Sequence, residues 1–218
     1  AGWLPFLLRA LTGLGWGIGM TATIAMCSDL ALSMGVIGIA GLVANALGPL
    51  LAEEIIRRFG AAWLYNASVL FLVAALACLL ATRRIVQPER VGPGGGLRVL
   101  KAVPWVLAAV VSAMPVFHGA IRGAMIYFIA VFGKSVGIGR VGPFFVVFSL
   151  AAILTRFGVG DLSDRHGRKK VILPAALIIV ANLFLIAQVR DLALLMVTGF
   201  IGGLGQGLIF PALSTYII

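Results

Sequence analysis

The chain has 218 residues, of which 61% are hydrophobic and only 11% carry a charged side chain. Soluble domains carry roughly 25% charged residues, so this composition excludes an ordinary soluble enzyme or binding domain and favours a protein dissolved in lipid. The formal net charge of +10 is better explained by basic loops that orient a membrane protein than by nucleic-acid binding, and we expect no nucleic-acid partner.

Uncharged runs long enough to cross a bilayer follow one another along the chain. The runs that contain no Asp, Glu, Lys or Arg are 10–28, 30–52, 59–82, 102–121, 171–189 and 192–218, and a further run, 141–160, is interrupted only by Arg156. A spanning helix needs about 20 mostly apolar residues, and lipid forces each backbone amide to pair within its own segment. We therefore predict an all-α membrane protein, a polytopic helical bundle with about seven transmembrane helices.

The first predicted span begins beside an arginine. Arg9 is followed by Gly13 and Gly15 in the pattern R-x-x-x-G-x-G. A charge inside a span is costly and by default indicates a functional site. The alternative is that Arg9 reaches the headgroups from the near end of the span, and both interpretations stay open.

The second predicted span is rich in small residues. Gly35 is followed by Ala44 and then by Gly48-Pro49, with Asn45 as an uncharged polar side chain among them. Proline frees a backbone carbonyl and bends a helix. We predict a kinked helix that packs closely against its neighbours.

Residues 83–103 interrupt the apolar pattern with basic residues, two prolines and three consecutive glycines. Because glycine and proline resist helix continuation, we predict a linker here, with a plain long loop as the alternative. The linker divides 1–82, the end of an N-terminal bundle with three spans, from 104–218, the start of a C-terminal bundle with four. A weak internal repeat supports two bundles: Gly13-Leu-Gly-Trp-Gly17 matches Gly203-Leu-Gly-Gln-Gly207.

Basic residues are distributed unequally between the two predicted faces. The loops on one face carry Arg83, Arg84, Arg90, Arg98, Lys101, Arg156, Arg165, Arg168, Lys169 and Lys170. The loops on the other carry Arg57, Arg58, Lys134, Arg140 and Arg190. An excess of Lys and Arg marks the cytoplasmic face, so we expect 83–103 and 160–170 in the cytoplasm.

The fourth predicted span contains the polar residues His118 and Arg122, with Tyr127 further along. The spacing i, i+4 puts His118 and Arg122 on one helical face. A cationic site suits an anionic or carboxylate-bearing substrate, and a histidine can relay protons near neutral pH. The alternatives are an interhelical hydrogen bond for His118 and an ion pair with an acid elsewhere for Arg122.

The most specific motif joins the fifth and sixth predicted spans. Residues 160–170 read GDLSDRHGRKK, and the residues that we single out are Gly160, Asp161, Asp164, Arg165, Gly167, Arg168 and Lys169. The glycines favour a sharp turn, Asp164 can cap the following helix, and the basic residues can reach headgroups or pair with the carboxylates. We predict a charged latch between two helices. The alternative is that these residues only mark the cytoplasmic face of the membrane. That would explain the basic residues but not the aspartates and glycines.

These motifs resemble those of the major facilitator superfamily. Its signature loop, G-x-x-x-D-R-x-G-R-[RK], is matched at every fixed position within 160–169, and its fourth helix carries the R-x-x-x-G-x-G pattern of Arg9. The antiporter motif of the fifth helix is matched at Gly35 and Gly48-Pro49, whereas Glu53 departs from its final glycine pair. The resemblance implies helices four to ten of a twelve-helix carrier, most similar to bacterial drug or solute–proton antiporters.

The resemblance implies a secondary active transporter that works by alternating access in a lipid bilayer. It places Asn45, His118, Arg122, Tyr127 and Gln206 at the central cavity and links Arg9 to proton transfer. We expect a monomer in a bacterial inner membrane that exports a small organic solute or drug in exchange for protons. The departure at Glu53 keeps open a proton-coupled importer of a sugar, an organic acid or a similar metabolite.

Enzymatic chemistry is not indicated. The spans offer His118 but no clustered acids, and Cys27 and Cys78 do not have metal-ligand spacing. We expect no enzyme activity, catalytic residue, cofactor or metal, and a non-transporting receptor on the same scaffold remains an alternative. Phe144, Phe145 and Phe148 are predicted to make packing or lipid contacts. Because the chain begins at Ala1 and stops at Ile218 within apolar stretches, we expect a fragment.

Overall fold

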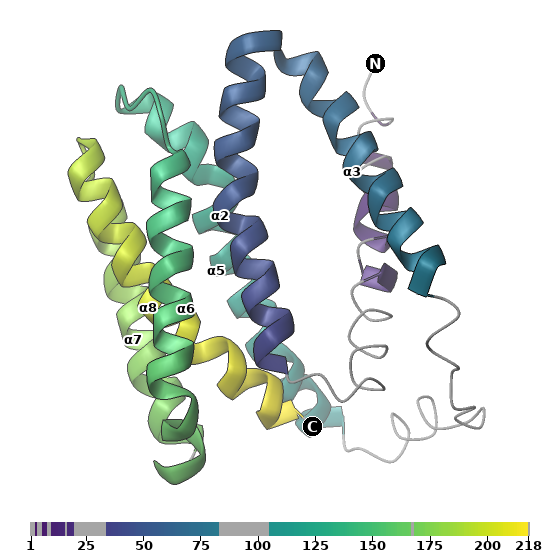
Figure 1. The fold of residues 1–218 in the computed structure, drawn as a ribbon. Coiled ribbons are helices and arrows are strands. Elements are labelled where there is room, and N and C mark those ends of the chain that lie inside the picture. The colour runs from purple at the N-terminus through teal and green to yellow at the C-terminus, as the bar shows by residue number, and fades with distance from the viewer. Residues whose placement is uncertain are drawn as a thin grey trace.

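The computed structural model describes residues 3, 6–7, 10–15, 17–19, 34–82, 105–166 and 168–217, and gives only the backbone of 34–37, 79, 81–82, 105–118, 158–166, 168–169 and 210–217. Within these residues the long helices are α2 (Met34–Phe59), α3 (Ala61–Thr82), α5 (Trp105–Ser135), α6 (Gly142–His166), α7 (Arg168–Ile186) and α8 (Leu192–Ile217). The described residues contain helices and turns but no strand, so the all-α prediction is confirmed (Figure 1).

Each predicted span from residue 30 onward corresponds to a helix, but several helices are longer than predicted. The span 30–52 becomes α2, which continues to Phe59, and the span 102–121 becomes α5, which continues to Ser135. The predictions stopped at charged residues, whereas the helices continue because long charged side chains at helix ends reach water or pair along the helix.

Three stretches of the described chain are long and apolar enough to cross a membrane: Gly38–Phe59, Ala61–Cys78 and Leu192–Ile209. Gly142–Phe157 and Lys170–Ile186 are apolar but shorter. The predicted spans 10–28 and 102–121 fall largely on residues whose side chains the structure does not describe.

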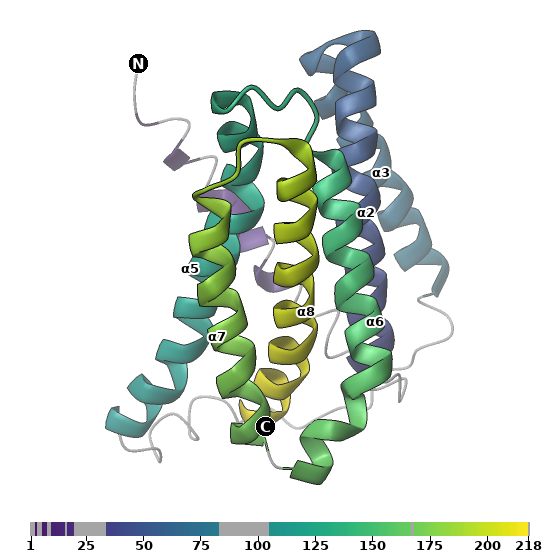
Figure 2. The same ribbon diagram turned by 90° about the vertical axis from the view of Figure 1, so that its left-hand side faces the viewer.

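The connections between helices alternate between two ends of the bundle (Figures 1 and 2). The α2–α3, α5–α6 and α7–α8 connections share one end, here called the Gly60 end, and the α6–α7 junction lies at the opposite, His166 end. Gly60 and Gly137 make two of these turns with φ of 88° and 79°, backbone conformations that favour glycine. The five basic residues predicted to share one face, Arg57, Arg58, Lys134, Arg140 and Arg190, all lie at the Gly60 end.

The best-buried part of the described chain is the interface of α6, α7 and α8. Glycines of α8 allow it to approach α6 closely: a Cβ atom added to Gly199 would lie 3.0 Å from the Phe144 ring, and one added to Gly207 would lie 2.7 Å from the backbone oxygen of Ala152. A Cβ at Gly203 would overlap the backbone of Phe148. Small residues at four-residue spacing let membrane helices pack backbone to backbone, so the glycine pattern of 203–207 does serve close packing.

Aromatic side chains fill the rest of this interface. Phe144, Phe145 and Phe148 are buried, with the Phe144 ring 5.3 Å from the Phe145 ring and 6.0 Å from the Phe148 ring between centroids. Their prediction as packing residues is therefore confirmed.

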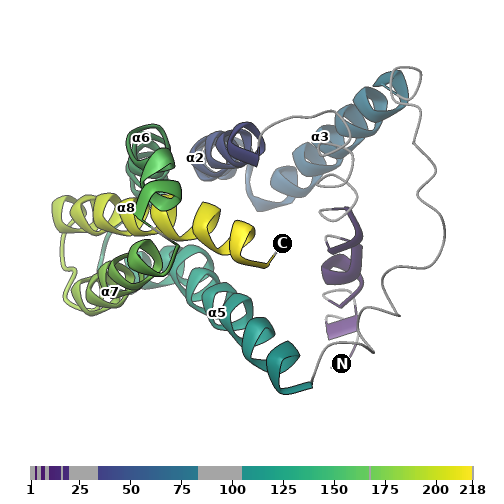
Figure 3. The same ribbon diagram turned by 90° about the horizontal axis from the view of Figure 1, so that it is seen from below.

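The hairpin of α2 and α3 is much more open. Figure 3 shows α2 beside α6 and α3 beyond it, away from α7 and α8. In α3 the apolar side chains Val69, Leu70, Phe71 and Leu72 are all exposed. A helix that is apolar on all sides is suited to contact with lipid or with further membrane helices.

Candidate functional site

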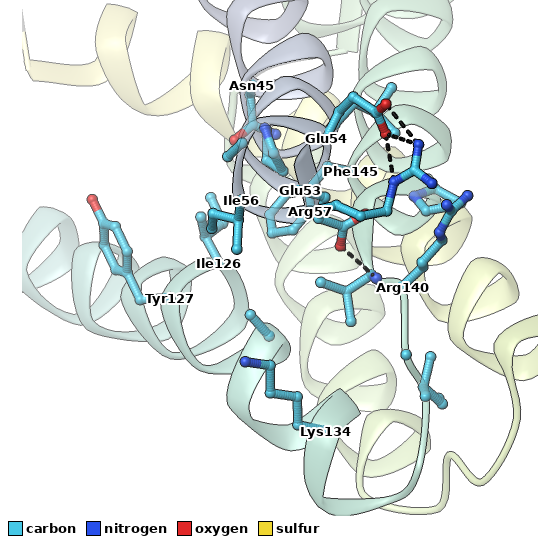
Figure 4. A pocket seen from close by; sticks show the side chains of 18 residues that line it. Asn45, Glu53, Glu54, Ile56, Arg57, Ile126, Tyr127, Lys134, Arg140 and Phe145 are labelled. Atoms are coloured by element: carbon cyan, nitrogen blue, oxygen red, sulfur yellow. Dashed lines mark hydrogen bonds and ion pairs between the residues drawn. The ribbon is translucent and has the colours of Figure 1, made fainter. Parts of the chain in front are cut away.

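A pocket of about 700 Å³ opens between α2, α5, the segment 136–141 and the start of α6 (Figure 4). It is lined by Asn45, Pro49, Leu50, Ala52, Glu53, Glu54, Ile56, Arg57, Ile126, Tyr127, Ala130, Lys134, Ile138, Gly139, Arg140, Val141, Pro143 and Phe145. Asn45 lies fourteen residues before the end of α2, which at 1.5 Å per residue is about 21 Å into the bundle from the Gly60 end. The volume lies within the range of small-molecule sites.

Glu53 connects the two sides of this pocket. One of its carboxylate oxygens, Oε1, accepts hydrogen bonds from the backbone amides of Val141 at 2.8 Å and Gly142 at 2.9 Å. These amides lie at the start of α6, where the first turn of a helix leaves amides without partners and attracts negative charge. Glu53 of α2 therefore caps α6.

Gly142 makes this cap possible. A Cβ atom at Gly142 would lie 2.7 Å from Leu50 Cδ2 and 2.8 Å from Glu53 Oε2. A larger residue would displace the end of one of these side chains, so glycine at 142 leaves room for both Leu50 and Glu53 against the start of α6.

Two further contacts follow the same interface, which we call the α2–α6 seam. The Asn45 amide Nδ2 donates to Ser149 Oγ at 3.1 Å, and the Arg156 guanidinium lies where a Cβ of Gly38 would be. Along α2 the contacting residues are Gly38, Asn45 and Glu53, which are seven and eight positions apart. Their partners, Arg156, Ser149 and Val141, are the same numbers of positions apart in the reverse direction. This is the pairing expected of two antiparallel helices that contact each other through one face each. The seam thus carries a polar contact about every two turns.

Charged residues are concentrated at the mouth of the pocket. Glu54 forms ion pairs with Arg57, at 2.7 Å, and with Arg58. Lys134 at the end of α5 and Arg140 just before α6 also line the pocket. Within the described part of the chain neither the Lys134 nor the Arg140 side chain has a hydrogen bond or an ion pair.

The structure brings some of the predicted cavity residues together and not others. Asn45 and Tyr127 line the pocket, and Arg122 lies one helical turn before the lining residue Ile126 on α5. Gln206 is buried in α8 and does not line this pocket. His118 lies on α5, and its side chain is outside the described residues.

The signature motif is less of a loop than predicted. Helix α6 continues through Gly160, Asp161, Asp164 and Arg165 to His166, and α7 begins at Arg168 with Lys169 in its first turn. The predicted turn at Gly160 is therefore wrong, and Asp164 lies in the last turn of α6, too early to cap α7. The helix can continue there because charged side chains at its end are able to reach water. Gly167 and the side chains of the motif lie outside the described residues.

The two motifs of the first spans are only partly described. Arg9 lies outside the described residues, while Gly13 and Gly15 are helical and exposed. In α2, Gly35 lies in the first turn, Ala44 and Gly48 are exposed, and Pro49 lies inside the helix without ending it. Apart from the adjoining backbone of α2, no described atom comes within 4 Å of a Cβ added at Gly48, so the close packing predicted for this motif is not seen in the described residues.

Two contributors to the seam were missed by the sequence reasoning. Arg156 was assigned to a loop, but it lies inside α6, ten residues before His166; the single charge in the run 141–160 was the signal. Ser149 has no charge or motif and gave none. The sequence showed that Glu53 departs from the antiporter motif. Its role as a cap could not be predicted, because it depends on how α2 and α6 pack in the folded protein.

The described residues contain no group of three or more His, Cys, Asp or Glu side chains that could hold a metal ion. Asn182 of α7 is fully buried beside Gly202, and its amide atoms have no hydrogen-bond partner among the described residues. It does not line the pocket.

Comparison with known proteins decides the family. The family model described as Major Facilitator Superfamily matches residues 3–218. The chain belongs to the major facilitator superfamily. Membership in this superfamily of membrane transporters confirms the predicted fold class and the expectation that the chain is not an enzyme.

Curated relatives agree with this assignment. The chain is 28% identical to "Multidrug resistance protein MdtG" of Citrobacter koseri over 231 residues, which cover 99% of this chain and 57% of the relative. It is 26% identical to the protein of the same name from Enterobacter lignolyticus, over 99% of this chain and 55% of the relative. "Myo-inositol transporter 2" of Schizosaccharomyces pombe is 32% identical over 117 residues, 52% of this chain and 21% of the relative. The chain thus spans little more than half the length of the first two, and no solved structure matches it significantly.

Proposed function

We propose that the complete protein is a secondary active transporter that exports small organic solutes or drugs in exchange for protons, by alternating access. The observation that carries the proposal is the position of the pocket. It lies between α2, which belongs to the predicted N-terminal bundle, and α5 and α6, which belong to the predicted C-terminal bundle. A carrier that works by rocking two bundles binds its substrate between them.

The chemistry of the α2–α6 seam supports a contact that opens and closes. Each of its contacts joins groups that water can also solvate: a carboxylate with backbone amides, an amide with a hydroxyl, and a guanidinium with a glycine surface. Separating such groups exchanges protein contacts for water contacts at a modest net cost. In the state of this structure, the seam is formed at the Gly60 end.

Export and proton coupling rest on different observations. Export of drugs is suggested by the two relatives named as multidrug resistance proteins. Proton coupling is supported by the carboxylate of Glu53 at the seam, and by the Arg9 motif of the sequence. We propose that the Gly60 end faces the periplasm, because basic residues are fewer in the connections of that end.

Transport by the complete protein in proteoliposomes tests the proposal. We expect a solute gradient to form only while a proton gradient is present, and to disappear when a protonophore is added. Glu53→Gln is expected to weaken the dependence on pH, whereas Glu54→Gln, one residue away and paired with surface arginines, is expected to leave it intact. Transport that continues unchanged without a proton gradient would rule out coupling.

An importer of a sugar-like metabolite is the second candidate, since one relative is named as a myo-inositol transporter. The direction of net flux separates the two. Uptake driven by an inward proton gradient would support the importer, whereas efflux driven by the same gradient would support the exporter. A complete protein that moves no solute under either gradient would instead indicate a receptor on a transporter scaffold.

A further inference from the structure

The acidic groups of the pocket are already engaged. Glu53 accepts two hydrogen bonds from the amides at the start of α6, and Glu54 is paired with Arg57 and Arg58. A carboxylate at a helix N-terminus or in an ion pair with two arginines attracts a further cation only weakly. The pocket is therefore poorly suited to recognise a cationic solute.

The basic groups of the pocket mouth are available. Lys134 and Arg140 line the pocket on its α5 and α6 sides, and neither side chain makes a hydrogen bond or ion pair with any described residue. In Figure 4 Arg140 lies beside Arg57 and Glu54, and Lys134 lies apart from it at the α5 side of the pocket. Positive charge around the mouth of a pocket with low-dielectric walls raises the local concentration of anions.

The inner part of the pocket is apolar. Pro49 and Leu50 line it from α2, Ile126 from α5 and Phe145 from α6. A further cation, Arg122, lies one helical turn before Ile126 on the same face of α5. A ligand that matches both the apolar lining and the nearby cations has an apolar body with one anionic group.

We infer that this pocket binds amphipathic organic anions, with the apolar body between Leu50, Ile126 and Phe145 and the anionic group attracted by the cations that line the pocket, Lys134 and Arg140. This inference rests on the proposed function for the claim that the bound molecule is carried. The binding itself follows from the pocket alone. Arg and Lys bind carboxylates and related anions through charge-assisted hydrogen bonds, which are about twice as strong as neutral ones.

A set of probes with one ring system and three charges tests the inference: a naphthoate, the neutral naphthamide and a naphthylmethylammonium. Equilibrium dialysis with the complete protein in detergent measures the binding of each. We expect the naphthoate to bind about tenfold more tightly than the naphthamide, and the ammonium to bind most weakly, since two partly exposed ion pairs each contribute a few-fold in affinity.

The double variant Lys134→Gln/Arg140→Gln is expected to abolish the preference for the naphthoate and to leave binding of the naphthamide unchanged. Unchanged naphthamide binding also shows that the variant is folded. Arg190→Gln is the matched control, because Arg190 is basic, exposed and at the same end of the bundle but does not line the pocket; it is expected to keep the full preference.

Three outcomes would overturn the inference: equal binding of naphthoate and naphthamide, tighter binding of the ammonium, or an equal loss in the double variant and in Arg190→Gln. None of these outcomes bears on whether the complete protein transports solutes. Conversely, a protein that binds naphthoate as expected but moves no solute in proteoliposomes would contradict the proposed function and leave the anion site standing.

Discussion

Helix α6 has two faces that pack in opposite ways. Toward α8 it meets Gly199, Gly203 and Gly207 through apolar side chains and backbone atoms, at distances that leave no room for an added Cβ. Toward α2 it uses Ser149, Arg156 and the amides of its first turn. In lipid, a close-packed glycine interface depends on contacts that no solvent replaces, whereas water can replace each polar contact of the α2–α6 seam.

The difference indicates which parts of the molecule move together. Helices α6, α7 and α8 form the unit with the best-buried side chains, and α2 is joined to it mainly by separable contacts. In a carrier that works by alternating access, we propose that the α2–α6 seam opens and that the α6–α8 interface does not.

The largest effect is expected from overpacking the α6–α8 interface. In Gly203→Leu the new side chain would overlap the Phe148 backbone and lie 2.8 Å from the Ala151 Cβ at its first atom. We expect a loss of about 3 kcal/mol of stability, measured as a lower midpoint of thermal unfolding in detergent. Gly41→Leu is the matched control, because no described atom beyond the adjoining backbone of α2 lies within 4 Å of a Cβ at that position. Equal midpoints for the two variants would show that the glycines do not define a tight interface.

A smaller effect is expected from removing the cap on α6. Glu53→Ala leaves the amides of Val141 and Gly142 without their acceptor, and loss of a helix cap costs about 1 kcal/mol. Because the cap also holds α2 against α6, the pocket should become more accessible. The rate at which a maleimide labels Ile126→Cys, in a background with Cys27 and Cys78 replaced by serine, is expected to rise several-fold.

Glu54→Ala is the control for the cap. Its ion pairs with Arg57 and Arg58 lie within α2 and are exposed, so neither the midpoint nor the labelling rate should change. If Glu53→Ala and Glu54→Ala label alike, Glu53 does not close the pocket.

The smallest effect concerns the hydrogen bond in the middle of the seam. A double-mutant cycle of Asn45→Ala and Ser149→Ala is expected to give a coupling energy of about 0.6 kcal/mol, the usual size for such bonds between membrane helices. Thr155→Ala replaces Ser149→Ala in the control cycle, because the Thr155 hydroxyl bonds the Ala151 carbonyl of its own helix. A coupling energy that is the same in both cycles would remove this contact from the seam.

The sequence predicted the existence and order of the helices well, because uncharged apolar runs of about 20 residues are typical of membrane-spanning helices and rare elsewhere. Helix ends were predicted less well: α2 continues past Glu53 and Glu54, and α6 continues through Asp164, because charged residues at helix ends are solvated or paired rather than excluded. Length and apolarity carry no information on where such a helix stops.

The site was predicted only in part. Asn45 was recognised as a polar group inside an apolar run and Tyr127 as a residue further along from His118 and Arg122, and both line the pocket. The cap from Glu53 to α6 joins residues 88 and 89 positions apart in the chain, and no local pattern specifies such a pair. Lys134 and Arg140 were counted as orienting charges, since their position at a pocket mouth depends on how α5 and α6 meet.

Distances between spin labels, measured by pulsed electron spin resonance on the complete protein in proteoliposomes, test the central claim most directly. One pair, Arg58→Cys with Gly139→Cys, spans the α2–α6 seam at the Gly60 end, and the other, Gly139→Cys with Arg190→Cys, spans the α6–α8 side; all three positions are exposed. With a transported solute or a proton gradient, we predict that the first distance shifts or becomes bimodal while the second keeps a single narrow distribution. A constant first distance, or equal shifts in both, would contradict the claim that the α2–α6 seam is the one that opens.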